Sequence, residues 1–171
     1  SLDILNNLKN EISKNAIIRL HPSYHSKRGQ YYVKKYFTKK NFSIDYGSES
    51  FVDARANSKI SFFNYDSTGI LENLALNYPT IFMWDNFKNN LSDEFLSKYE
   101  LLIKANILFL DKKDLVNHLN NIWQNIDKWW LSENTQKLFI YQFKSWRSKP
   151  SQLQPILTQF SIVFLYTPKE S

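Results

Sequence analysis

Two hydroxyl side chains, Ser67 and Thr68, stand where a predicted strand gives way to a predicted helix. The apolar run from Ile60 to Phe63 is typical of a buried strand, and apolar residues after Gly69 recur at helical spacing. The first N–H groups of a helix lack intrahelical partners and carry partial positive charge, so they bind anions well. This turn could therefore hold a phosphate group. The alternative is that Ser67 only caps a structural helix.

Glu72 lies four residues beyond Thr68, on the same face of the predicted helix. Its carboxylate could accept hydrogen bonds from the two ribose hydroxyls of a nucleotide whose phosphate sits at the turn. The alternative is that Glu72 only stabilises the helix dipole near its positive end. No pair of carboxylates stands at strand ends in a way that would indicate a general acid and a general base.

His21 directly follows another predicted buried strand, and Pro22 ends that strand because proline cannot continue the ladder. An imidazole N–H at this place could hold a phosphate oxygen. A structural role for His21 fits the sequence equally well. His25, Lys27 and Arg28 in the following loop could add positive charge, although each of them also fits a solvated basic loop.

The elements that must position these residues alternate between strand and helix. Strands are predicted at 16–20, 42–46, 59–63, 80–84 and 107–110, and helices at 2–13, 31–37, 50–57, between 67 and 79, at 92–104, at 111–125 and within 127–143. Continuous apolar strands are typical of a parallel sheet covered on both faces. We expect an α/β fold with a Rossmann-like, doubly wound parallel sheet. Ligands of such sheets bind beyond the carboxyl ends of the strands, where His21 and Ser67 fall.

This alternation covers residues 1–143, which we take as one domain. Residues 144–171 form a C-terminal extension of unclear role, because Pro150 and Pro155 interrupt the pattern. The run from Ile162 to Tyr166 is apolar but has no clear partner. The chain begins with Ser1 and not with Met, which is typical of a piece of a longer protein.

The composition narrows the class of protein. The hydrophobic content of 43% and the charged content of 22% are those of a folded soluble domain. The net charge of +6 suits a phosphorylated ligand or an anionic lipid, and the scattered lysines do not favour nucleic acid. Without cysteine, a signal peptide or a membrane span, we expect a cytoplasmic protein. The basic residues 27–40 could add peripheral contact with the inner face of the membrane.

Other motifs give no competing chemistry. The chain has no GxGxxG sequence and no Walker A loop. His21, His25 and His118 lack the spacing of a metal-ligand set, so we expect no metal and no cofactor. The Trp129–Trp130 pair is most simply a packed helix face.

Three short motifs in this order resemble the C-terminal, donor-nucleotide half of GT-B glycosyltransferases. Ile18 to Pro22 is similar to the HP motif, and Asp66 to Thr68 to the serine motif, of bacterial sialyl-, polysialyl- and Kdo-transferases, related surface-carbohydrate transferases and CDP-glycerol glycerophosphotransferases. Gly69 and Glu72 followed by Pro79 resemble the Gly…Glu…Pro pattern of many GT-B donor domains. The likeness covers roughly residues 10 to 143.

This resemblance implies a nucleotide-sugar-binding domain. Its nucleotide-binding residues would be His21, Pro22, Lys27, Ser67, Thr68, Gly69 and Glu72. His21 and the Ser67–Thr68 turn would hold the donor phosphate, Glu72 the ribose, and Lys27 is a weaker phosphate candidate. The implied donor is a CMP- or CDP-linked sugar for cell-surface polysaccharide, with UDP as the alternative. The nucleotide-sugar is a substrate, so no cofactor is implied.

The resemblance also implies what this chain needs from elsewhere. In GT-B enzymes an N-terminal half binds the carbohydrate acceptor and usually supplies the catalytic base or nucleophile. We therefore leave the catalytic residues unknown, and expect them in an N-terminal half of the same enzyme. We expect negligible transfer by the isolated chain. The alternative is a non-catalytic, Rossmann-like binding or interaction module.

Overall fold

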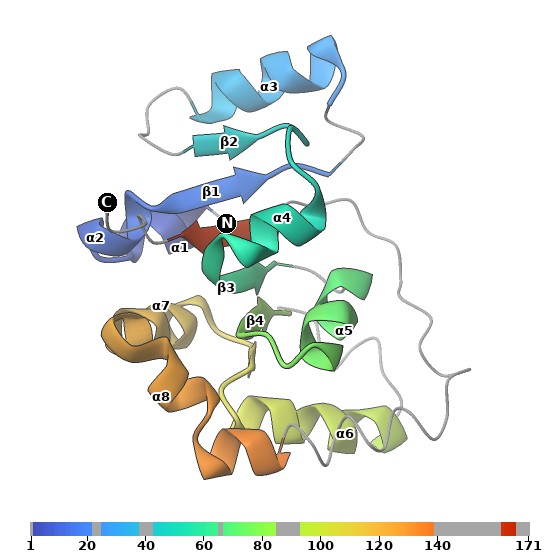
Figure 1. Ribbon diagram of the computed structural model, residues 1–171, viewed down its shortest axis with the longest axis vertical. Helices are drawn as coiled ribbons and strands as arrows, with labels where there is room; N and C mark the ends of the chain where they lie inside the picture. Colours follow the sequence, from blue (N-terminus) through green and yellow to red (C-terminus); the bar gives the residue numbers. More distant parts are fainter. Residues whose placement is uncertain are drawn as a thin grey trace.

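The computed structural model describes residues 2–21, 25–37, 43–64, 67–84, 93–138 and 162–166 (Figure 1). In chain order, its elements are α1 (Leu2–Asn7), α2 (Asn10–Ser13), β1 (Ala16–Arg19), α3 (Lys27–Phe37), β2 (Ser43–Asp45), α4 (Phe51–Ala56), β3 (Ser58–Phe63), α5 (Thr68–Ala75), β4 (Thr80–Met83), α6 (Asp93–Lys104), β5 (Leu108–Phe109), α7 (Lys112–Ile122), the 3-10 turn η3 (Trp123–Asn125), α8 (Ile126–Trp130) and β6 (Ile162–Tyr166). Residues 133–138 are also helical.

The strands of the described residues form one six-stranded sheet in the order β2-β1-β6-β3-β4-β5. β1 pairs with β2 in parallel, and β3, β4 and β5 are parallel to one another. Strands that alternate with helices in this way confirm the predicted α/β, Rossmann-like class. All five strands predicted within residues 16–110 are present, each within two residues of its predicted ends.

β6 is the difference from the wholly parallel sheet that the sequence predicts. It runs antiparallel to β1 on one side and to β3 on the other (Figure 1). The run from Ile162 to Tyr166, which has no clear partner in the sequence, thus has two partners in the centre of the sheet. A strand–helix alternation identifies neighbouring parallel strands. It carries no information about a strand that returns from the far end of the chain.

Helices cover both faces of the sheet and bury two apolar clusters. On one face, side chains of α1, α2, α7 and η3 pack with Ile18 of β1 and Phe62 of β3. On the other face, side chains of α5 and α6 pack with Phe63 of β3 and Phe82 of β4. Neighbouring residues of β3 therefore point to opposite clusters, as the two-residue period of a strand requires.

Three of the predicted helix starts are capped as the sequence indicates. Ser50 accepts a hydrogen bond from the N–H of Asp53, Ser67 from that of Gly69, and Asp111 from two backbone N–H groups. Each cap satisfies donors that have no partner inside the helix.

Other helix boundaries differ from the sequence prediction. The helix predicted at 2–13 is two helices, because Lys9 has an extended ψ of 146°. α3 begins at Lys27, four residues before the predicted start at Tyr31. Val52 of α4 is 58% exposed although it is apolar. The predicted start of the helix at 92–104 lies outside the described residues. None of the helices in the described ranges has the length and apolar character needed to cross a membrane.

Candidate functional site

The carboxyl ends of β1 and β3 lie at the same edge of the sheet. Arg19, the last residue of β1, and Phe63, the last residue of β3, both lie opposite Ile162 of β6. β1 and β3 are therefore parallel and two strand spacings apart, about 10 Å. His21 follows β1 and Ser67 follows β3, so both predicted phosphate ligands belong to this edge.

The N-terminus of α5 has the geometry of a capped helix start. Ser67 is extended, with φ −144° and ψ 143°, and its Oγ accepts a hydrogen bond from the N–H of Gly69 at 3.2 Å. Thr68 is the first helical residue, and its side chain is exposed. Because the cap uses Ser67 Oγ as an acceptor, the hydroxyl hydrogen can still donate to an anion.

Gly69 allows α5 to lie close against its neighbours. A Cβ at this position would stand 3.0 Å from Cε1 of Phe63 and 3.3 Å from Cζ of Phe51. Phe63 is fully buried, so its ring has little room to move. This close packing is a structural reason for glycine at position 69, in addition to the ligand role that the family resemblance implies for it.

Glu72 lies one turn into α5 with an exposed side chain. The buried face of the helix consists of Gly69, Ile70, Asn73 and Leu74. The Oδ1 atom of Asn73 accepts a hydrogen bond from Arg55 at 3.4 Å. α5 is therefore anchored by its inner face, while Thr68 and Glu72 remain at the surface.

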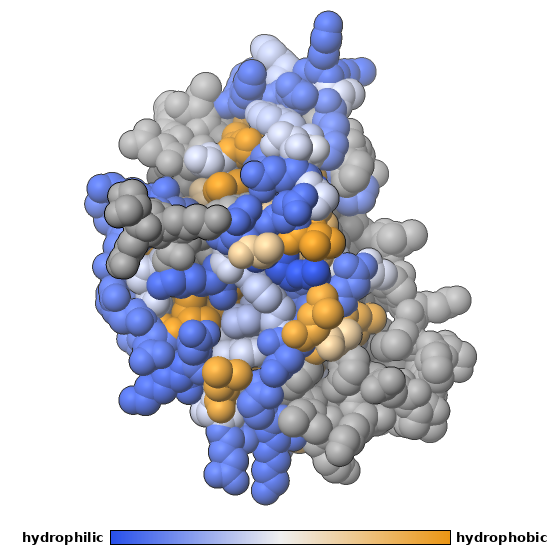
Figure 2. Space-filling model, in the orientation of Figure 1, coloured by the Kyte–Doolittle hydropathy of each residue, from blue (hydrophilic) through white to orange (hydrophobic). Residues whose placement is uncertain are grey.

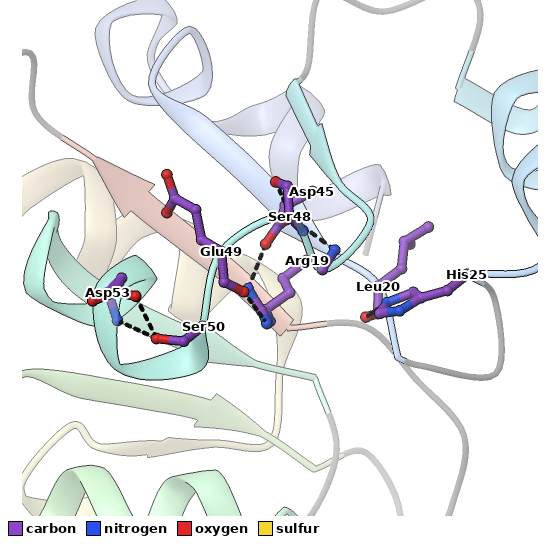
Figure 3. A network of polar contacts seen from close by, with 9 residues as sticks. Arg19, Leu20, His25, Asp45, Ser48, Glu49, Ser50 and Asp53 are labelled. Atoms are coloured by element: carbon purple, nitrogen blue, oxygen red, sulfur yellow. Dashed lines mark hydrogen bonds and ion pairs between the residues drawn. The ribbon is translucent and has the colours of Figure 1, made fainter.

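The loop after β1 places one histidine firmly in the fold. Nε2 of His25 lies 3.0 Å from the carbonyl oxygen of Leu20 (Figure 3). A carbonyl only accepts, so Nε2 carries the proton. Gln30 donates to the carbonyl of His25 at 2.9 Å, and a Cβ at Gly47 would meet the His25 ring at 2.5 Å. The interpretation of His25 as part of a solvated basic loop is therefore incomplete, because its ring binds the carbonyl of Leu20 and packs against Gly47.

His21 and Lys27 flank this anchored segment. His21 is half-buried and directly follows Leu20. Lys27 is the first residue of α3, and its side chain is exposed. Ser26 lies just before the helix, and its Oγ accepts a hydrogen bond from the N–H of Gly29 at 3.1 Å. Pro22 and Asp66 lie outside the described residues.

A polar network that the sequence did not indicate joins the ends of β1 and β2. Nη1 of Arg19 lies 2.5 Å from Oδ2 of Asp45, and Nη2 donates to the carbonyl of Glu49 at 2.8 Å (Figure 3). Oδ1 of Asp45 accepts hydrogen bonds from the N–H groups of Gly47 and Ser48. Arg19 and Asp45 each end a strand, but nothing in the sequence indicates that they form a pair.

This network fixes the ionisation of Asp45. Burial alone would raise the pKa of its carboxyl, but the hydrogen bonds from Gly47 and Ser48 and the charge of Arg19 outweigh it, so the pKa is lowered from 3.8. Gly47 follows with φ +87°, a left-handed conformation that glycine adopts without strain. The loop between β2 and α4 is thus held in one shape beside the loop that contains His25.

Other titratable groups in the described residues do not form a reactive cluster. No three His, Asp or Glu side chains in the described ranges are placed to hold a metal ion. The ring of His118 lies between those of Phe109 and Trp129, with centroids at 5.3 and 5.0 Å, and its contact with Trp129 is edge-to-face. Trp130 is 1% exposed, which confirms that the tryptophan pair is part of a packed helix face.

The edge formed by β1 and β3 thus brings predicted site residues from two strand ends to one side of the sheet, with the exposed carboxylate of Glu72 one turn along α5. The hydroxyls of Ser67 and Thr68 lie at the start of α5 on one side, and His21 follows β1 on the other. Such an arrangement can bind an anion and a neighbouring hydroxyl group.

The comparisons with known proteins point to one protein family. The sequence model described as LIC12162 family transferase matches residues 1–153. No curated protein and no solved structure matches the chain significantly.

Proposed function

Because the chain belongs to the LIC12162 family of transferases, we propose that it binds the nucleotide-activated donor of a GT-B glycosyltransferase reaction. The donor in this proposal is a CMP- or CDP-linked sugar, with UDP as the alternative nucleotide. The acceptor is a carbohydrate, in the synthesis of a cell-surface polysaccharide.

One observation carries this proposal: the two predicted phosphate ligands belong to the same edge of the sheet, on either side of the place where the strand order reverses. From β1 the chain goes outward to β2, and then returns past β1 to build β3, β4 and β5 on the other side. In doubly wound sheets this switch point is where nucleotides bind. His21 follows β1 there and Ser67 follows β3.

Each residue has a separate role in the proposed site. The hydroxyls of Ser67 and Thr68, at the positive end of the α5 dipole, bind the phosphate that leaves with the nucleotide. His21 donates a further hydrogen bond to it from the opposite side. Donors aimed at this phosphate would stabilise the charge that develops as the sugar departs. Glu72, one turn along α5, accepts hydrogen bonds from the ribose hydroxyls.

Calorimetric titration of the chain with CMP, CDP and UDP tests the proposed binding. Replacing His21 with Ala should weaken nucleotide binding by about 1.5–3 kcal/mol, the usual contribution of a hydrogen bond to a charged group. This corresponds to a loss of roughly 10- to 150-fold in affinity. The replacement His118→Gln serves as the control and should leave nucleotide affinity unchanged, because His118 contacts Phe109 of β5 and Trp129 and is not part of the proposed site.

Two results would count against the proposal. Equal CMP affinity in the wild type and the His21→Ala variant would remove His21 from the site. No binding of any of the three nucleotides would instead favour a non-catalytic module that uses this sheet for another partner.

A further inference from the structure

β6 differs from its neighbours in direction and in its relation to the family. It runs antiparallel between β1 and β3, whereas those two strands are parallel to each other. The region that matches the transferase family ends at residue 153, before β6 begins at Ile162. The family-matched region therefore contains β1 to β5 and does not contain the strand at the centre of this sheet.

β1 and β3 pair with β6 in the same register. Ile18 and Phe62 lie opposite the same residue of β6, and so do Ala16 and Ile60. All four side chains belong to the same apolar cluster on one face of the sheet. A register that is wrong by one residue would turn side chains to the opposite face. Direct pairing of β1 with β3 in the present register keeps every one of these side chains on its own face.

We propose that β6 is a removable spacer strand, and that β1 and β3 pair directly when β6 leaves. The sheet then has the order β2-β1-β3-β4-β5 and is wholly parallel. This is one of the two common orders of doubly wound sheets. The inner-edge N–H and C=O groups of β1 and β3 bind β6 in one state and each other in the second, so both states satisfy them.

The spacer would control the width of the proposed nucleotide site. With β6 in place, the ends of β1 and β3 are about 10 Å apart, and without it they are about 5 Å apart. His21 and Ser67 follow these ends, so they converge more easily on one phosphate after β6 leaves. This consequence rests on the proposed function, whereas the strand exchange itself does not.

A pair of prolines in β6 tests the exchange in the full chain. Consecutive residues of a strand direct their N–H groups to opposite neighbours, so Val163→Pro with Phe164→Pro removes one donor toward β1 and one toward β3. The matched control, Val163→Ile with Phe164→Val, keeps both donors and the strand preference. NMR of isotope-labelled protein then reports which backbone protons lie close together across strands.

The wild type and the control should show backbone NOEs between β1 and β6. The proline variant should stay folded, lose these NOEs and gain NOEs between Ile18 and Phe62. Loss of cooperative folding in the proline variant, retention of the contacts with β6, or a folded protein with no contact between β1 and β3 would each overturn the proposal.

The same variants separate the exchange from its effect on the site. The proline variant should bind CMP several-fold more tightly than the control does. New NOEs between β1 and β3 without any CMP binding would support the strand exchange and contradict the proposed nucleotide site.

Discussion

His118 is a histidine that the fold keeps neutral. Its Nε2 is buried without a hydrogen-bond partner, and its ring lies between the rings of Phe109 and Trp129. Burial disfavours the charged imidazolium, so the pKa of His118 is lowered from 6.5 to about 4. Between these two pH values the unfolded chain binds a proton that the folded chain does not.

The stability of the folded chain should therefore depend on the ionisation of His118. The contribution of the neutral ring to the free energy of unfolding is fully present above pH 6.5, and it is lost as the pH falls toward about 4. With allowance for the partial exposure of the ring, acidification from pH 7.5 to pH 4.5 should cost about 1–2 kcal/mol through this residue. Urea unfolding at both pH values measures the change.

The replacement His118→Phe provides the comparison for this measurement. It keeps an aromatic ring between Phe109 and Trp129 and cannot take up a proton. The variant should lose less stability on acidification than the wild type does. An equal loss in both proteins would show that His118 does not cause the pH dependence.

Single residues were predictable from the sequence only where they act through the adjacent backbone. Ser50, Ser67 and Asp111 are such cases, because a capping side chain binds N–H groups two or three residues along the chain. Arg19 and Asp45 are the opposite case, since their ion pair joins two strands. A spacing of 26 residues gives no sequence signal for such a contact.

At the scale of elements, α5 and α7 provide a test of binding against stability. Ser67 caps α5 at the proposed site, and Asp111 caps α7 after β5. Replacing either cap with Ala should lower the free energy of unfolding by about 0.5–2 kcal/mol, because backbone N–H groups lose their partner. Only Ser67→Ala should also weaken CMP binding, since its hydroxyl is a proposed phosphate ligand.

Thermal unfolding and calorimetry on both cap variants measure these two effects separately. Equal CMP affinities in Ser67→Ala and Asp111→Ala would reduce Ser67 to a structural cap. That is the alternative which the sequence alone left open.

The elements themselves were largely predictable, and their boundaries were less so. Apolar spacing identified β1 to β5 and the main helices because each buries one face or lies wholly inside. The break at Lys9 had no signal, since neither glycine nor proline stands there. β6 was not predictable because its partners are about 100 residues away or more.

At the scale of the whole molecule, positive charge gathers on one helix. α3 contains no acidic residue, and Lys27, Arg28, Lys34 and Lys35 are exposed on it. These cations and Tyr31, which is 63% exposed, share one helical face. α3 lies beyond β2 at one end of the sheet, where hydrophilic residues dominate the visible surface (Figures 1 and 2).

This face should bind anionic vesicles at low salt, because each cation near a charged membrane contributes about 1 kcal/mol. Lys34→Glu with Lys35→Glu should abolish the binding. Lys112→Glu with Lys113→Glu makes the same charge change on α7 and should retain it. Cosedimentation with phosphatidylglycerol vesicles at two salt concentrations measures the difference. Equal losses in both variants would mean that net charge, and not α3, determines the binding.

The central place of β6 also imposes an order of events on synthesis. A ribosome makes β1 and β3 first, and roughly 100 residues follow before β6, a delay of about 5–20 s at ordinary elongation rates. During that time no later strand exists to separate β1 from β3. The nascent chain can therefore pair β1 directly with β3 first. The finished sheet would then form when β6 inserts between these two paired strands.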